Sequence, residues 1–136
     1  MLPSKALEYA RDLVASGWCQ GVEARDQAGR PVEPWDPSAV AWSLIGAVVA
    51  IAHDAAGDAA FLEQVGLSTL ALGTVTRSEE LKDWNDEPRR THEDVLRAYD
   101  AAAEMLPRLV AAQPKRQAAR RGLARLGRRQ AIDTTV

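Results

Sequence analysis

The sequence predicts a mainly α-helical fold, a compact bundle of about four helices with a small β-hairpin between the first and second helices. Three observations predict it: apolar residues recur at helical spacing in several segments, one long run is apolar apart from Ser43 and Gly46, and one glycine-bearing stretch lacks helical spacing. The chain has 136 residues, of which 46% are apolar and 26% are charged, as is typical of one globular domain.

The first helix is expected to begin near Ser4 and to end at Gly17, with an apolar stripe of Ala6, Leu7, Ala10, Leu13 and Val14. Residues 18–25 show no such stripe, and a glycine-bearing loop at 26–29 follows. Two short extended segments around this loop form the predicted hairpin. Pro31 confines the second segment to an edge, because proline lacks a backbone donor.

The central helix is predicted from the apolar run at residues 39–52. Asp36 before Pro37 is typical of a helix start, so we expect the helix to begin there and to end near Ala56, before Gly57. The run is shorter than the roughly 20 residues that a bilayer span needs. It therefore indicates a helix buried in the protein's own core, and we expect no membrane association.

Three further helices are expected. One runs from about Asp58 to Leu72, and a short one at residues 78–86 precedes a proline. The last begins at Thr91, which with Asp94 resembles a capping box. Its apolar stripe consists of Val95, Leu96, Tyr99, Ala102, Leu106, Leu109 and Val110.

The net charge of −2 conceals an acidic body and a basic tail. Residues 114–136 carry seven basic groups and one acid, which leaves ten basic and eighteen acidic groups in residues 1–113. We expect a single helical domain at 1–113 and a basic C-terminal tail at 114–136. The tail could bind nucleic-acid phosphates in a salt-sensitive way, contact an acidic protein surface, its own included, or have no specific role. Its candidate contact residues are Arg120, Arg121, Arg125, Arg128 and Arg129.

Cys19 is the single cysteine, so no internal disulfide can form, and Glu8 and Asp12 interrupt any signal peptide. We therefore expect a cytoplasmic protein. Cys19 and His53 lack a motif typical of a nucleophile and its base, and the spacing of His53 and His92 matches no metal pattern. We expect no catalytic residue, no cofactor and no metal site.

The most distinctive polar segment precedes the last helix and contains Asp83, Trp84, Asn85, Asp86 and Arg90. A structural interpretation has Asn85 and Asp86 bonded to their own loop and Trp84 anchored in the core. A functional interpretation makes the loop a recognition surface, on which Trp84 stacks against a flat ligand or a partner. The functional interpretation gains weight if Trp18 and Gln20 converge on the same place.

Trp35 is one of four tryptophans and lies between two prolines, at the expected entrance of the central helix. The other three fit core packing more readily. Trp35 is therefore the candidate contact residue for a protein partner.

Three segments together resemble a known family: the Trp-Cys-Gln-Gly segment at 18–21, the stretch at 36–47, and the Leu-x-Asp-Trp-Asn-Asp motif at 81–86. This order is similar to a family of small uncharacterised proteins from bacteria, notably actinobacteria, and their phages. The resemblance spans roughly residues 5–112 and leaves out the basic tail. The family has no known function, so the resemblance implies an origin and no activity.

The function that these observations favour is a non-catalytic binding or interaction module of bacterial or phage origin, acting through an unidentified protein partner. One alternative is a nucleic-acid-associated accessory protein that uses the arginine-rich tail. The other is a small enzyme with a polar site at the Trp-Asn-Asp loop. The oligomeric state is open.

Overall fold

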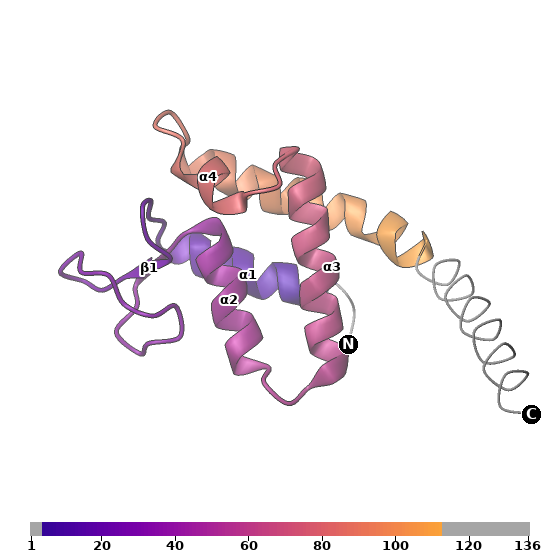
Figure 1. Cartoon of the computed structure of the whole chain (residues 1–136), viewed down its shortest axis with the longest axis horizontal. Coiled ribbons are helices and arrows are strands. Elements are labelled where there is room, and N and C mark those ends of the chain that lie inside the picture. The colour runs from indigo at the N-terminus through magenta and orange to yellow at the C-terminus, as the bar shows by residue number, and fades with distance from the viewer. Residues whose placement is uncertain (1–3, 113–136) are drawn as a thin grey trace, which may run out of the picture. The chain divides into compact units, whose positions relative to one another are not determined.

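The structure is a computed structural model that describes residues 4–112. The chain divides into two compact units, one ending at Leu106 and the other beginning at Pro107. The described part is mainly helical, with a small two-stranded antiparallel sheet between the first two helices, as predicted (Figure 1). Its labelled helices are α1 (Ser4–Ser16), α2 (Leu44–Asp54), α3 (Ala59–Thr76) and α4 (Leu81–Asp86). Helical residues resume at 92 and continue to 112.

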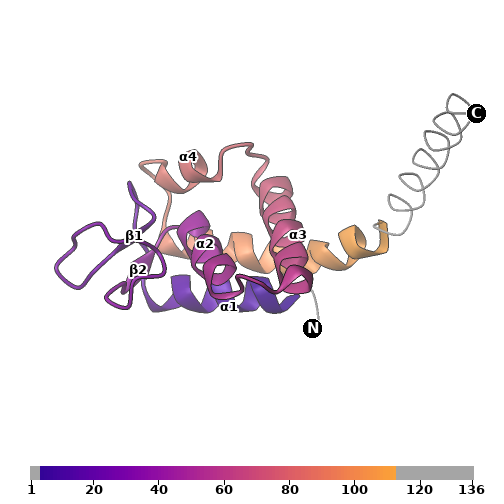
Figure 2. The same cartoon turned by 60° about the horizontal axis from the view of Figure 1, so that its bottom comes forward.

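The helices of the first unit pack around one apolar core. Helices α2 and α3 run side by side, and α1 crosses them on one side (Figures 1 and 2). A bidentate pair joins α1 to the last helix, with Arg11 Nε 2.7 Å from Asp100 Oδ1 and Arg11 Nη2 3.2 Å from Asp100 Oδ2. Burial of each large apolar side chain contributes about 1.5–3 kcal/mol. The largest fully buried apolar and aromatic side chains are Tyr99, Leu7, Leu44, Leu72, Leu106, Val14 and Val95.

The small sheet pairs β1 (Ala24–Arg25) with β2 (Ala41–Trp42). The segment around Pro31, predicted as the second strand, contributes only an isolated bridge to Arg25. Trp42 also bridges in parallel to Trp18, and its amide donates to the carbonyl of Gly17 at 2.9 Å. Strand β2 therefore lies between β1 and the segment that follows α1.

Helix α2 begins at Leu44, so the prediction of a start at Asp36 and Pro37 is wrong. Ser43 is the N-cap, and its side chain accepts a hydrogen bond from the amide of Gly46 at 3.0 Å. Asp36 instead closes a turn, accepting from the amide of Ser38 at 2.8 Å.

Pairing with β1 explains the later start of α2. The amide of Val40 donates to the Arg25 carbonyl at 2.9 Å, and the amide of Ser43 donates to the Glu23 carbonyl at 3.0 Å. A helix begun at Pro37 would direct these amides to carbonyls four residues back. The pairing between segments therefore overrides a good local start signal.

Helix α2 also approaches the strand segment too closely for a side chain at one position. A Cβ built on Gly46 would overlap the carbonyl oxygen of Glu23. Glycine at this position lets the backbones of the helix and the β1 segment touch.

Helix α3 ends later than predicted, and the last helix begins with the predicted cap. Helix α3 continues past Leu72 to Thr76, and Arg77 takes the left-handed cap conformation with φ 54° and ψ 35°. The predicted capping box is confirmed, because the amide of Thr91 donates to Asp94 Oδ2 at 3.0 Å and the amide of Asp94 donates to Thr91 Oγ1 at 3.1 Å.

Candidate functional site

Asn85, on α4, lies fully buried at the centre of a polar network. Its Oδ1 accepts from Trp18 Nε1 at 2.8 Å and from the amide of Leu44 at 2.9 Å. Its Nδ2 donates to the carbonyl of Cys19 at 3.1 Å and to Asp86 Oδ1 at 3.0 Å. An amide side chain has two acceptor and two donor positions, and all four are filled here.

The bond to Leu44 gives Asn85 a second role at the start of α2. The first amides of a helix have no partner within the helix. Ser43 satisfies the amide of Gly46, and Asn85 satisfies the amide of Leu44. The two side chains together cap α2, although they lie far apart in the sequence.

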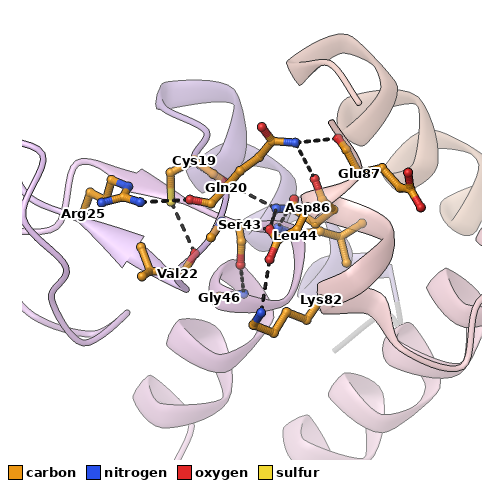
Figure 3. A network of polar contacts seen from close by, with 12 residues as sticks. Cys19, Gln20, Val22, Arg25, Ser43, Leu44, Gly46, Lys82, Asp86 and Glu87 are labelled. Carbon is orange, nitrogen blue, oxygen red and sulfur yellow. Dashed lines mark hydrogen bonds and ion pairs between the residues drawn. The ribbon is translucent and has the colours of Figure 1, made fainter. Parts of the chain in front are cut away.

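Asp86 extends the network to the surface (Figure 3). Its Oδ1 accepts from the amide of Gly21 at 2.9 Å, and its Oδ2 lies 3.2 Å from Lys82 Nζ. Burial raises the pKa of Asp86, but the hydrogen bonds from Gly21, Asn85 and Lys82 outweigh it, so the pKa lies below its ordinary value. Asp86 is therefore a carboxylate at neutral pH.

Gln20 closes the network from the other side. Its Nε2 donates to the carbonyls of Asn85 and Glu87, each at 2.9 Å, and Figure 3 shows the side chain reaching across to Glu87. The carbonyl of Gln20 accepts from Arg25 Nη2 at 3.0 Å. The Trp-Cys-Gln-Gly segment and the C-terminal half of α4 are thus joined by side chains of both.

Trp18 is held on two sides. Besides donating to Asn85, its ring stacks on His92 with centroids 6.0 Å apart and planes 16° apart. His92 Nε2 lies 2.6 Å from the carbonyl oxygen of Val14, within hydrogen-bonding distance. Trp18 therefore connects the end of α1 to the last helix and to α4.

Trp84 and Arg90 form a separate contact. The Arg90 guanidinium lies 3.8 Å from the centroid of the Trp84 ring, and its Nε donates to the Trp84 carbonyl at 2.9 Å. Trp84 is half-buried, whereas Asp83 is exposed on α4. Of the predicted site residues, the structure brings together Trp18, Gln20, Asn85 and Asp86.

Trp35 lies outside this network and is 41% exposed. Its ring stacks on His53, at the end of α2, with centroids 4.4 Å apart and planes 5° apart. The carbonyl of the preceding Pro34 accepts from Trp42 Nε1 at 2.8 Å. The exposed ring is therefore held on one side by His53, and the backbone before it is fixed by Trp42. No local sequence signal indicates that His53 would be its partner.

Cys19 is buried, and its thiol lies 3.6 Å from the carbonyl of Val22. Burial raises the pKa of Cys19, and the positive charge of Arg25 opposes this only in part. Because the thiolate is the nucleophilic form, this thiol is a weak nucleophile at neutral pH.

Among residues 4–112, no three His, Cys, Asp or Glu side chains gather closely enough to hold a metal ion. No helix in the same range is both long enough and apolar enough to cross a membrane. The candidate tail contacts Arg120, Arg121, Arg125, Arg128 and Arg129 lie outside the described residues.

Fold and network define a class, a small mainly helical protein in which a buried asparagine joins the segment after α1 to α2 and α4. A family model described as "Family of unknown function (DUF6197)" matches residues 1–105. The chain belongs to this family. No curated protein and no solved structure matches the chain.

Proposed function

We propose that the protein is a non-catalytic interaction module that binds a protein partner through Trp35 and the loop of residues 32–40 around it, the Trp35 loop. The observation that carries this proposal is an exposed tryptophan fixed in place by a parallel ring stack on His53. Tryptophan is enriched among the residues that dominate binding energy at protein interfaces.

The Trp35 loop supports the proposal because its own hydrogen bonds order it in the absence of a partner. Asp36 Oδ1 accepts from both the amide and the hydroxyl of Ser38, at 2.8 and 2.7 Å. Val40, at the end of the same loop, is 47% exposed and adds apolar surface. An ordered loop loses less conformational entropy on binding, so more of the contact energy contributes to affinity.

The polar network supports a non-catalytic role for the Trp-Asn-Asp segment. Every hydrogen-bonding position of Asn85 is engaged by the protein itself, as are both carboxylate oxygens of Asp86. A ligand would have to displace these bonds. We therefore propose that this segment stabilises the fold. Separately, we propose that the protein acts in the cytoplasm of a bacterium or of a phage-infected bacterium.

The test is co-purification of tagged full-length protein from its host, comparing the wild type with Trp35→Ala and Leu70→Ala. Leu70 is 43% exposed on α3 and is the matched control, because it presents similar apolar exposure away from the loop. We expect one protein to be retained at high salt by the wild type and by Leu70→Ala and to be lost with Trp35→Ala. Equal retention by all three proteins would refute the role of Trp35.

The excess of basic residues in the tail favours a second candidate, an accessory protein that contacts nucleic acid. The same co-purification distinguishes it, with a chain truncated after Gln113 and with low and high salt. Nucleic acid that is lost with the tail, and lost with salt for the full chain, would favour this second function. Such a loss of nucleic acid would not change the comparison of protein retention between the wild type and Trp35→Ala.

A further inference from the structure

A groove between α1, the end of α2 and the start of α3 is lined by Tyr9, Ile51, Asp54, Ala55, Asp58 and Phe61, with a volume of about 430 Å³. We propose that this groove docks a basic amphipathic helix of a protein partner, with an apolar side chain inserted between Tyr9 and Ile51 and Lys or Arg residues beside the two aspartates. The groove includes no residue of the Trp35 loop, so the proposal stands apart from the function proposed above.

The apolar part of the groove is built from aromatic rings. Phe61 is buried to 6% exposure, and Tyr9 stacks on it with centroids 6.4 Å apart and planes 24° apart. Tyr9 itself is 42% exposed. The groove therefore offers an aromatic surface that an apolar side chain would remove from water. A volume in the range of about 300–1,000 Å³ is usual for a binding pocket.

The charge of the groove selects the partner. Its lining contains the carboxylates of Asp54 and Asp58 and no Lys, Arg or His. Lys5, one helical turn before Tyr9, is paired with Glu8 on its own helix at 3.4 Å. The acidic excess of residues 1–113 has the same sign and would steer basic segments toward this face.

The two aspartates differ in what they do for the fold. Asp58 is the N-cap of α3, and its Oδ1 accepts from the amide of Phe61 at 3.0 Å. Asp54 lies 4.0 Å from His53 Nδ1 and is otherwise solvent-exposed. Asparagine caps helices as well as aspartate does, so both charges can be removed by substitution to Asn with little cost to the fold.

A basic amphipathic helix satisfies both parts of the groove at once. Apolar side chains recur on one face of such a helix at positions i, i+3 and i+4, and Lys or Arg can flank them. Binding of amphipathic helices in apolar grooves is an established recognition mode. The geometry favours this occupant over an acidic segment, which the two carboxylates would repel.

The test is a calorimetric titration of the full-length protein with a synthetic helical peptide of leucine and lysine at amphipathic spacing. The comparison peptide has glutamate in place of lysine. The double variant Asp54→Asn/Asp58→Asn should bind the basic peptide about two- to thirty-fold more weakly, the loss expected for two exposed ion pairs. The control variant Glu79→Gln/Glu104→Gln removes the same net charge from exposed sites outside the groove and should bind like the wild type.

The apolar contact is tested with Tyr9→Ala, which should weaken binding of the basic peptide about ten-fold or more. Circular dichroism of each variant checks that the fold is kept, and Trp35→Ala should bind the peptide like the wild type. Equal weakening by the two charge variants would overturn the proposal, as would equal binding of the acidic peptide or no binding of either. Sedimentation showing self-association abolished by Tyr9→Ala would assign the groove to a second copy instead.

Discussion

Replacing Asn85 by alanine should cost much of the stability of the fold. The substitution removes the acceptor of the Leu44 amide and of the Trp18 indole, and it removes the donor to the Cys19 carbonyl. Asn85 is fully buried, so water cannot simply take its place. The change also breaks the bond that orients Asp86 toward the Gly21 amide.

The magnitude follows from the groups left without partners. A buried polar group without a hydrogen bond costs about 1–3 kcal/mol. The Leu44 amide and the Cys19 carbonyl are in this position, while the half-buried Trp18 indole can turn to water. We therefore expect a loss of about 2–6 kcal/mol, a large share of the 5–15 kcal/mol that is typical of a small domain.

The assay is urea unfolding followed by circular dichroism and tryptophan fluorescence. The midpoint should fall by about 2 M, because the free energy of a small domain changes by about 1–3 kcal/mol per molar urea. Asp83→Ala is the matched control, since Asp83 lies on the same helix and is exposed; it should stay within about 0.5 kcal/mol of the wild type. A loss below about 1 kcal/mol for Asn85→Ala would refute the structural role of the network.

Three further predictions concern stability and can be measured by thermal or urea unfolding. Gly46→Ala should destabilise by several kcal/mol, because the new Cβ overlaps the Glu23 carbonyl oxygen and the backbones must separate. Tyr99→Phe should cost about 1–2 kcal/mol, because the buried hydroxyl donates to the Leu44 carbonyl at 2.6 Å. Stability should fall as the pH drops below about 4. A carboxyl whose pKa is lower in the folded state than in the unfolded state stabilises the fold above the unfolded-state pKa, and this stabilisation is lost as the pH falls through the folded-state pKa. The carboxyls with lowered pKa are Asp26, Asp36, Asp86 and Asp94.

Gly66→Ala is the control for Gly46→Ala, because no atom lies near a Cβ at Gly66 and alanine favours a helix over glycine, so this change should leave stability unchanged or raise it. Unchanged or raised stability in Gly46→Ala as well would contradict the close backbone contact. For Tyr99→Phe, an unchanged midpoint would argue that the hydroxyl bond contributes nothing. For the pH dependence, Asp86→Asn should give a shallower fall than the wild type as the pH drops below about 4. An identical slope would count against a lowered pKa at this position.

Local signals predicted the fold class and most helices, and they failed where distant segments compete. The apolar stripes and the Thr91 and Asp94 box are encoded within a few residues, so their outcome could be predicted. Asp36 and Pro37 form an equally good local signal. The backbone pairing of Val40 and Ser43 with the β1 segment overrides this signal. That pairing involves residues too far from Asp36 in the sequence to be read from its neighbours.

The residues of the candidate site could be predicted from the sequence, but their hydrogen-bond partners could not. Composition and motif singled out Trp18, Gln20, Asn85 and Asp86, which the structure joins. Their partners are mostly backbone groups, such as the Leu44 amide, and these carry no sequence signature. Ser43 lies directly before the apolar residues of α2 and is a residue type typical of a helix N-cap. Asp36 with Pro37 is a competing start signal earlier in the chain, and it led to the wrong start.

Hydrogen exchange at the Leu44 amide tests most directly the claim that Asn85 joins the distant motif segments. Leu44 is the first residue of α2, where amides ordinarily exchange fast because they lack a partner within the helix. The bond to Asn85 predicts that the Leu44 amide exchanges as slowly as that of Val48 inside the helix, and that Asn85→Ala abolishes this protection. Fast exchange of the Leu44 amide in the wild type would show that Asn85 does not hold the start of α2.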